Sequence, residues 1–394
     1  MSQSAGGERH SPLAMLERLV AFETESSLSN LALVDFVVAY LAGWGVPTLR
    51  VPNASGDKSA ILATIGPSDR GGIVLSGHTD CVPVAGQAWT SDPFRLRVAD
   101  GRAYGRGAVD MKGFDALALA AVPDFLDARL TTPIHILLSY DEETTCLGSL
   151  DIIARFGRDL PLPVAAIVGE PTNLAVVDAH KSVATFNTIV HGHEAHSAKP
   201  SLGANAVMAA GELLAELNRL ADEMETRGDP TGRFDPPYTS VHAGRVQGGN
   251  ARNILAKDCL IAWEYRGVPG LDPDEIPGRF DAFAAEVERA RLNRHGPYGR
   301  IATEREVLVP GLRPEPGSRA ERLGLALTGG TRTESVPFAT EAGHFQAAGI
   351  PTIVCGPGSI DRAHQPDENI TLDELAAGEA FMHRLAERCA AGEV

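Results

Sequence analysis

The sequence has few cysteines and no long apolar run. Only five of its 394 residues are cysteine, an odd number, and none forms a C-x-x-C pair. This argues against a disulfide framework and against a zinc knuckle built from thiolates, so a reducing, cytoplasmic environment is expected. No apolar stretch approaches the roughly 20 residues that cross a membrane. The first 15 residues lack the apolar segment of a signal peptide, and none is expected.

Basic residues are also scarce. The chain has 35 Lys and Arg against 51 Asp and Glu, which gives a formal net charge of −16. A field of this sign repels nucleic acids and anionic membranes, so neither is expected as a partner. The apolar fraction of 44% and the charged fraction of 22% are those of an ordinary globular protein. The length predicts two domains.

The two ends of the chain predict one α/β domain. Apolar residues recur at helical spacing in four stretches, which are 13–22, 33–41, 114–126 and 372–386. Short apolar runs with strand character lie between them, at 60–65, 73–76, 134–139, 164–168 and 352–355. Strands that alternate with helices indicate a mixed, largely parallel sheet flanked by helices.

The middle of the chain predicts a different architecture. Its strands and helices follow one another in the order β-α-β-β-α, over 184–190, 205–224, 239–246, 255–265 and 275–295. This is the order of a ferredoxin-like α+β unit, which a strand within 301–309 can close. We expect this unit to be a domain inserted over 181–311, with 1–180 and 312–394 forming the α/β domain.

Polar side chains follow the predicted strands. His78 and Asp80 lie in the stretch 76–80, which directly follows the run 73–75, and they share one face of an extended chain because Thr79 separates them. Functional groups gather at the carboxyl ends of strands in open α/β sheets. A neutral imidazole is a good zinc ligand, and a nearby carboxylate can orient it. The sequence therefore indicates a polar site after this strand.

An acidic triplet follows another apolar run. Asp141, Glu142 and Glu143 come after the strand 134–139. Three adjacent carboxylates at the end of a buried strand repel one another unless cations neutralise them. A solvated turn is the alternative, but the position after a core strand favours a metal site. Glu170 comes just after the run 164–168, and His364 follows the strand 352–355 and a loop.

Glycines surround a further candidate. Asp110 lies in the stretch GRGAVDMKG, where the glycines permit a close approach of the backbone. A dinucleotide-binding fingerprint is the competing interpretation. It fails because Asp110 stands where the third glycine is required, and because no clear strand precedes the first.

Together these residues predict a dinuclear metal site. Two histidines and three carboxylates can hold two zinc ions if one carboxylate bridges, and this set is His78, Asp110, Glu143, Glu170 and His364. Two such ions activate water and polarise a carbonyl. Glu142 then remains free to take the proton of the water and pass it to a leaving amine. We expect zinc, with cobalt as an alternative metal.

Three alternatives remain beside a metallohydrolase. A serine hydrolase lacks support, because the sequence has no G-x-S-x-G elbow. Cys81, next to Asp80, could act as a thiol nucleophile. A binding protein with a relic site would be favoured by the loss of a ligand or of Glu142, and none is lost.

The motifs resemble those of a known family. It is the metallohydrolase family of acetylornithine deacetylase, succinyl-diaminopimelate desuccinylase, aminoacylase and related carboxypeptidases. The resemblance covers nearly the whole chain, and all five motifs occur in order. Within the family the acetylornithine deacetylase branch is the most similar, on the stretches HK at 180–181, GGNARN at 248–253, TEA at 340–342 and GPGSI at 356–360.

This resemblance implies a fold, a reaction and a substrate. The expected fold is a zinc-peptidase-like catalytic domain with an inserted lid that also mediates homodimerisation. The expected reaction is removal of the acetyl group from N2-acetyl-L-ornithine to give L-ornithine and acetate, a step of arginine biosynthesis. Another N-acyl-amino-acid deacylase, a desuccinylase or a dipeptidase of the same family is the alternative.

The resemblance also implies roles for single residues. In the catalytic domain Asp110 would bridge the two metals, with His78 and Glu170 completing one site and Glu143 and His364 the other. Glu142 would be the general base for attack by metal-activated water, and Asp80 would lie behind His78.

Three residues of the insert receive roles in the same way. His196 resembles the lid histidine that binds the scissile carbonyl, often in the site of the partner subunit. Asn253 and Arg266 resemble lid residues that hold the carboxylate of the substrate.

Overall fold

The computed structural model describes residues 7–394. The chain divides into two compact units, which we call the α/β unit and the insert unit. The α/β unit runs to Ala179 and also contains Pro314–Glu334 and Thr340–Val394, while the insert unit comprises His180–Arg313 and Ser335–Ala339. The last of these segments lies outside the predicted insertion. The Ser335 hydroxyl of this segment donates a 2.5 Å hydrogen bond to the carbonyl oxygen of Arg233 in the same unit.

An eight-stranded mixed sheet forms the centre of the α/β unit. Its strands, in spatial order, are β1 (Thr48–Pro52), β2 (Ser59–Ile65), β6 (Ile134–Ser139), β3 (Ile73–His78), β7 (Ala165–Pro171), β14 (Thr352–Gly356), β8 (Val177–His180) and β13 (Glu334–Val336). The four central strands β6, β3, β7 and β14 are parallel. Antiparallel strands flank them on both sides. A separate three-stranded sheet consists of β15 (Asn369–Thr371), β5 (Arg102–Tyr104) and β4 (Arg97–Ala99).

The central strands are buried along their whole length. Strands covered by helices on both faces read as continuous apolar runs, which is why the sequence predicts these four most clearly. The edge strand β1 is only partly buried, so its sequence carries no such run.

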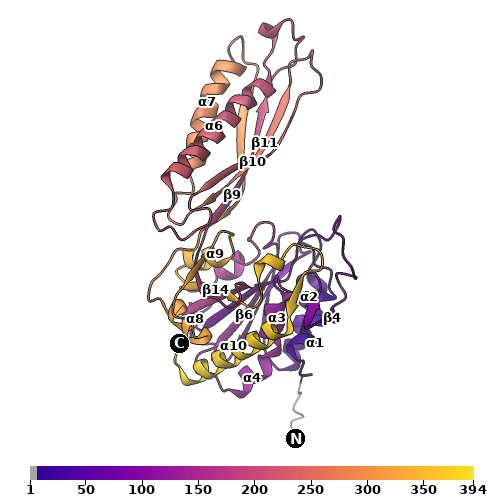
Figure 1. Ribbon diagram of the computed structural model, residues 1–394, viewed down its shortest axis with the longest axis vertical. Coiled ribbons are helices and arrows are strands. Elements are labelled where there is room, and N and C mark those ends of the chain that lie inside the picture. Colours follow the sequence, from indigo (N-terminus) through magenta and orange to yellow (C-terminus); the bar gives the residue numbers. More distant parts are fainter. Residues whose placement is uncertain (1–6) are drawn as a thin grey trace. The chain divides into compact units, whose positions relative to one another are not determined.

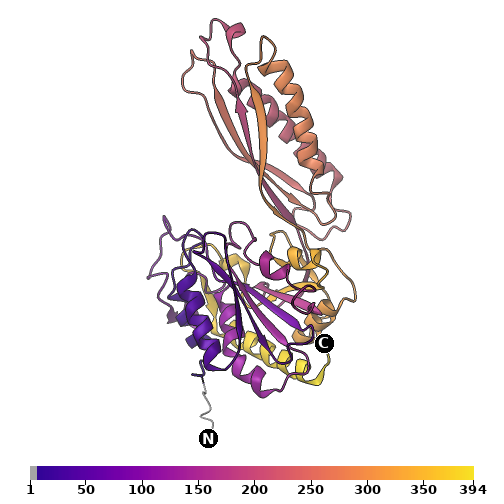
Figure 2. The ribbon, with the colours of Figure 1, turned by 180° about the vertical axis from the view of Figure 1, so that it is seen from behind.

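Helices cover both faces of this sheet. They are α1 (Pro12–Val20), α2 (Leu31–Gly43), α3 (Lys112–Ala120), α4 (Val122–Asp127), α5 (Leu150–Ile153), α8 (Arg319–Thr328), α9 (Ala342–Ala347) and α10 (Leu372–Ala391), with the 3-10 turn η3 at Ile360–Arg362. Figure 1 shows α3 and α10 side by side, and α1 also packs against α3. The short helices α5 and α9 contact each other near the opposite face, which Figure 2 presents. The helix predicted over 114–126 is two helices, since α3 ends at Ala120 and α4 begins at Val122 with Pro123 in its first turn.

Two glycines let α3 approach the strand ends closely. A Cβ atom at Gly77 would lie 2.0 Å from Oδ1 of Asp115, and one at Gly169 would lie 2.1 Å from the ring of Phe114. Each glycine directly precedes a predicted metal ligand. A side chain at either position would therefore push α3 away from the end of β3 or β7.

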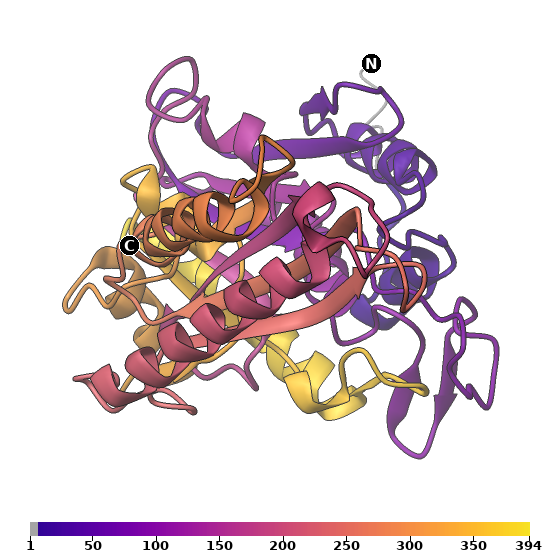
Figure 3. The same ribbon diagram turned by 90° about the horizontal axis from the view of Figure 1, so that it is seen from above.

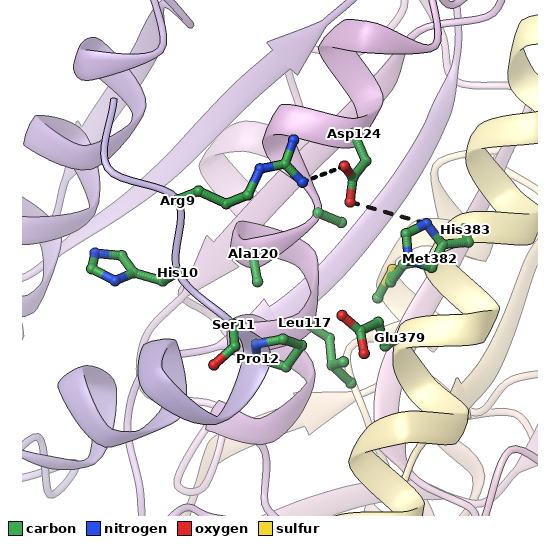
Figure 4. A pocket seen from close by; sticks show the side chains of 11 residues that line it. Arg9, His10, Ser11, Pro12, Leu117, Ala120, Asp124, Glu379, Met382 and His383 are labelled. Carbon is green, nitrogen blue, oxygen red and sulfur yellow. Dashed lines mark hydrogen bonds and ion pairs between the residues drawn. The ribbon is translucent and has the colours of Figure 1, made fainter. Parts of the chain in front are cut away.

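The chain segment before α1 packs on the helical layer (Figure 4). Arg9 forms a 2.5 Å ion pair with Asp124, and His383 of α10 lies 4.0 Å from the same carboxylate. The cavity between these elements is also lined by Leu117 and Met382. None of the predicted site residues lines it, so it is distinct from the candidate metal centre.

The insert unit is a four-stranded antiparallel sheet with two helices on one face. The strand order is β10 (Ser240–Gly248), β11 (Asp258–Gly267), β9 (Ser182–His191) and β12 (Arg300–Val309). The helices are α6 (Ala206–Arg227) and α7 (Glu275–Val287), which continues into the π-helical turn η2 (Glu288–Leu292); the 3-10 turn η1 covers Pro200–Leu202. Figure 3 shows α6 and α7 side by side across the sheet.

An aromatic cluster holds this unit together. The ring of Trp263 stacks on Phe186 at a centroid distance of 4.2 Å and meets Phe280 of α7 at 4.9 Å. Its indole N–H donates to Thr188 at 3.0 Å, so the buried polar atom is satisfied. The predicted fold class, a mixed sheet flanked by helices with a separate α+β unit, is confirmed. Within residues 7–394 no helix is both long enough and apolar enough to cross a membrane.

Candidate metal centre

Five predicted ligands meet at one edge of the central sheet. His78 is the last residue of β3, Glu170 lies near the end of β7, Glu143 follows β6, and His364 follows β14. Parallel strands bring their carboxyl ends to the same edge, so residues far apart in the sequence gather there. Asp110 reaches this edge from the loop between β5 and α3.

The donor atoms form two groups that share Asp110. One group is His78, Asp110 and Glu170, and the other is Asp110, Glu143 and His364. Within each group the donor atoms lie within 4.8 Å of one another. The two oxygens of Asp110 face different histidines, because Oδ1 is 3.2 Å from Nε2 of His78 and Oδ2 is 3.1 Å from Nε2 of His364. Asp110 therefore has the position of a bridging ligand.

Two carboxylates of these groups are buried close to other acidic side chains. Burial raises the pKa of Glu143 to about 7, and the charge of Asp110 adds to this shift. Burial also raises the pKa of Glu170 well above its usual range, together with the charges of Asp110 and Glu142. Oε1 of Glu143 is buried and has no hydrogen-bond partner among residues 7–394. A crowded set of nitrogen and oxygen donors with these raised carboxylate pKa values fits a pair of divalent cations.

Glu142 lies beside these groups and belongs to neither. Its Oε2 is 3.9 Å from Nε2 of His78, so the carboxylate faces the first group. Burial raises the pKa of Glu142 to about 8, and the charge of Glu143 contributes in the same direction. The residue thus offers a carboxylate that is free to exchange a proton next to both ligand groups.

Asp80 supports the site from behind His78. The Nδ1 atom of His78 lies 3.0 Å from the backbone oxygen of Asp80 and 3.5 Å from its Oδ1, so Nδ1 donates and Nε2 is left for a metal. The carboxylate of Asp80 also accepts hydrogen bonds from the hydroxyl of Ser26 at 2.6 Å and from the backbone N–H groups of Glu142 and Glu143 at 3.2 and 3.4 Å. One buried carboxylate therefore fixes the orientation of His78 and the backbone of Glu142.

A buried ion pair holds the backbone of Asp110 in place. Oε1 of Glu368 accepts hydrogen bonds from the backbone N–H groups of Val109 and Asp110 at 3.0 and 3.1 Å. Oε2 of Glu368 accepts one from Arg106 at 2.6 Å, and both charged side chains are almost fully buried. Arg106 also donates to Gln87, whose amide donates to the backbone oxygen of His364 at 2.8 Å. The network connects the backbone of Asp110 with that of His364.

Sequence reasoning missed this pair. Arg106 and Glu368 both lie inside stretches that the sequence singles out, yet neither received a role. A charged residue in a glycine-rich or acidic motif is expected at the surface, and only the fold shows that these two side chains are buried.

Cys81 does not have the environment of a reactive thiol. Burial raises its pKa to about 11, so the sulfur stays protonated at neutral pH. The thiolate is the nucleophilic form of cysteine. This argues against the thiol-nucleophile alternative.

The structure brings together two of the three predicted insert residues. The backbone N–H of Ser197, next to His196, donates to the carbonyl oxygen of Asn253 at 3.0 Å, so the two loops lie side by side. Arg266 lies at the other end of β11. The strand from Asp258 to Arg266 spans eight residue steps, about 26 Å at the usual rise. Arg266 is therefore far from Asn253 within one insert unit.

Arg266 already has an acidic partner. Its Nε and Nη2 atoms donate to Oε1 and Oε2 of Glu264 at 3.0 and 3.3 Å, from the same face of β11. Both side chains are about one-third exposed. The guanidinium of Arg266 thus makes two parallel hydrogen bonds to the Glu264 carboxylate. A substrate carboxylate that binds Arg266 would compete with Glu264 for these donors.

A family model and similar proteins of known name point to the same family. The model of peptidase family M20/M25/M40 matches residues 74–388. The acetylornithine deacetylase of Myxococcus xanthus is 36% identical and covers 94% of this chain and 95% of its own length. The acetylornithine deacetylase of Proteus mirabilis is 33% identical, and the match covers 96% of this chain and 95% of that protein.

Solved structures have the same fold. A metallo-carboxypeptidase of the M20 family from Sulfolobus solfataricus superposes with a TM-score of 0.74 at 17% identity. The match covers 97% of this chain and 100% of the carboxypeptidase. A dinuclear metal-binding M20 peptidase from Bacillus subtilis gives a TM-score of 0.65 at 15% identity, covering 95% and 98%. The resemblance carried by the five motifs is thus confirmed, and the chain belongs to peptidase family M20/M25/M40 as a metal-dependent amidohydrolase.

Proposed function

We propose that this chain hydrolyses N2-acetyl-L-ornithine to L-ornithine and acetate, a step of arginine biosynthesis. The observation that carries the proposal is the pair of ligand groups sharing Asp110, with Glu142 beside them and outside both. The choice of substrate is supported by relatives named acetylornithine deacetylase, which are 33–36% identical over nearly the whole chain.

Each ligand group would hold one divalent cation. His78, Asp110 and Glu170 would bind the first, and Asp110, Glu143 and His364 the second. We propose zinc, with cobalt as the alternative. Bound there, two such cations would polarise the scissile carbonyl and lower the pKa of water.

Glu142 would transfer the proton. We propose that its carboxylate takes a proton from the attacking water and delivers it to the nitrogen of the leaving amine. Asp80 supports this role, because it holds the backbone N–H of Glu142 and directs Nε2 of His78 toward the carboxylates. The base and its neighbouring ligand are thereby oriented by the same side chain.

The insert unit would bind the substrate. We propose that His196 polarises the scissile carbonyl, and that Asn253 and Arg266 hold the carboxylate of the amino acid. One carboxylate cannot reach both ends of β11, which lie about 26 Å apart. We therefore propose that His196 and Asn253 come from one subunit and Arg266 from its partner, in a homodimer.

The insert unit has a surface suited to a second copy. Its strand β10 is at the edge of the sheet and has unpaired backbone groups on one side. Apolar side chains nearby are exposed, with Met208 at 68%, Val246 at 48% and Val207 at 40%. An edge strand beside exposed apolar residues is a typical surface for association, and we propose that two chains pair there.

We also propose that the enzyme is cytoplasmic. All five cysteines are unpaired and buried, which agrees with a reducing environment.

A substrate panel tests the proposed reaction. Purified protein loaded with zinc or cobalt would be assayed on N2-acetyl-L-ornithine, N-succinyl-diaminopimelate, N-acetylmethionine and simple dipeptides. We expect the highest kcat/KM on N2-acetyl-L-ornithine. A higher value on another compound would assign the chain to that activity of the family instead.

A further inference from the structure

The thiol of Cys146 touches the side chain of Glu142. Its sulfur lies 3.2 Å from Oε1 of Glu142 and 3.3 Å from the backbone oxygen of the same residue. No other side chain in the described part of the chain donates a hydrogen bond to the Glu142 carboxylate. The second oxygen, Oε2, is the one that faces Nε2 of His78. The thiol therefore contacts one oxygen and leaves the other toward the ligand group.

The backbone is shaped to bring this thiol to the base. After β6 the chain turns back, and the N–H of Cys146 donates to the carbonyl oxygens of Asp141 at 2.9 Å and Glu142 at 3.2 Å. Cys146 has a φ of +54°, in the left-handed region that a residue with a side chain seldom adopts. Such strain persists where the surrounding structure holds it, and it is frequent at functional sites. The turn thus holds Cys146 in an unfavourable backbone conformation that places its thiol beside Glu142.

We propose that Cys146 is a positioning residue for Glu142, holding its Oε1 so that Oε2 points at the reacting centre. The inference rests on the proposed function in one respect, which is the role of Glu142 as the base. It adds a residue that sequence reasoning counted only as a free cysteine.

The thiol of Cys146 has two acceptors within reach. The sulfur is within hydrogen-bond distance of two acceptors and has one proton to donate. Donation to Oε1 connects this oxygen to the turn and leaves Oε2 directed toward His78. Burial keeps the pKa of the thiol well above its usual value, so the sulfur retains this proton.

Three variants test the proposal, assayed on whichever panel substrate the wild type hydrolyses fastest. Cys146→Ala removes the donor, and we expect kcat to fall about tenfold, the effect of losing one moderately strong hydrogen bond. KM and metal content should stay at wild-type values. Cys146→Ser keeps a donor at the same position and should restore most of kcat. Cys389→Ala is the matched control, since this buried cysteine lies in α10 and has no contact with Glu142.

A double variant separates positioning from a structural role. In a Glu142→Ala background, adding Cys146→Ala should cause no further loss of the residual kcat, because the thiol acts through Glu142 alone. A purely structural cysteine would lower the activity of both backgrounds by the same factor, and that result would overturn the proposal.

Three other outcomes are also decisive. A Cys146→Ala enzyme with wild-type kcat, or a Cys146→Ser enzyme as slow as Cys146→Ala, would overturn the inference and leave the proposed function intact. A wild-type enzyme inactive on every panel substrate would overturn the proposed function itself, and this inference with it.

Discussion

Nε2 of His364 lies 2.9 Å from Oε2 of Glu143, although the two residues follow different strands of the sheet. Hydrogen bonds to Asp110 and Glu143 raise the pKa of His364 to about 10, so without a cation the imidazole is charged at neutral pH. A histidine that binds a metal must be neutral. A proton and a metal therefore compete for this nitrogen.

Metal binding at pH 8 should release protons. His364 loses about one proton when a cation takes its Nε2, because its pKa of about 10 lies above the working pH. Zinc titrations by calorimetry in two buffers with different ionisation enthalpies measure the number released. The apparent affinity should rise from pH 6 to pH 9, as protons leave the ligands. Binding without proton release at pH 8 would mean that His364 is not a ligand.

Replacing the base should separate catalysis from metal binding. We expect Glu142→Gln to lower kcat by about 10²- to 10⁴-fold, the usual contribution of a positioned general base. The metal content should remain that of the wild type, since Glu142 belongs to neither ligand group. Activity assays and elemental analysis of the same samples check both points. A parallel loss of metal would identify Glu142 as a ligand.

The bridging position of Asp110 should govern both metals. The two ligand groups predict that the fully loaded wild type approaches two ions per chain. Asp110→Asn removes the charge shared by both groups, so we expect weaker binding at both sites and loss of activity. Elemental analysis after extensive dialysis measures the ratio. A wild type that holds only one ion at saturating zinc would contradict the bridge.

Breaking the buried ion pair should destabilise the fold. Glu368→Gln leaves Arg106 without its charged partner while both are buried, and we expect the free energy of unfolding to fall by about 3–5 kcal/mol. Urea denaturation of the metal-free protein measures this loss. The double variant Arg106→Met/Glu368→Leu removes both charges and should recover part of it. A single variant as stable as the wild type would exclude the supporting role of this pair.

Mixed subunits should reveal whether His196 acts across a dimer. We expect His196→Ala to lower kcat by about 10²-fold or more while the metal content is unchanged. Glu142→Gln and His196→Ala proteins, each nearly inactive, would be combined and allowed to exchange subunits. If His196 serves the partner's site, a mixed dimer has one site without either change, and a random mixture regains about a quarter of wild-type activity. No recovery after proven exchange would place His196 in the site of its own chain.

Much of the fold could be read from the sequence because burial leaves a pattern. The strands β3, β6, β7 and β14 are covered on both faces and appear as apolar runs. Edge strands such as β1 were missed, since a half-exposed strand of five residues has no such run. The order of elements in the insert unit was also predicted, because each helix there is long and amphipathic.

Side-chain contacts were harder to predict. The thiol of Cys146 and the carboxylate of Glu368 lie within 3.5 Å of groups in the metal centre, and neither has a sequence signal of its own. The length of β11 keeps Asn253 and Arg266 apart within one chain, so their predicted role in holding one carboxylate requires two subunits.

The sequence by itself determined the polar residues at the strand ends and the family that they indicate. Residues such as His78 and Glu170 directly follow apolar runs, and adjacency along the chain is visible without coordinates. Only the tertiary structure decided that Asp110 turns one oxygen to each histidine, that Glu368 holds its backbone, and that a thiol rests on Glu142. These relationships join segments through space or through a strained turn, and they depend on distances of a few ångströms that only the folded chain defines.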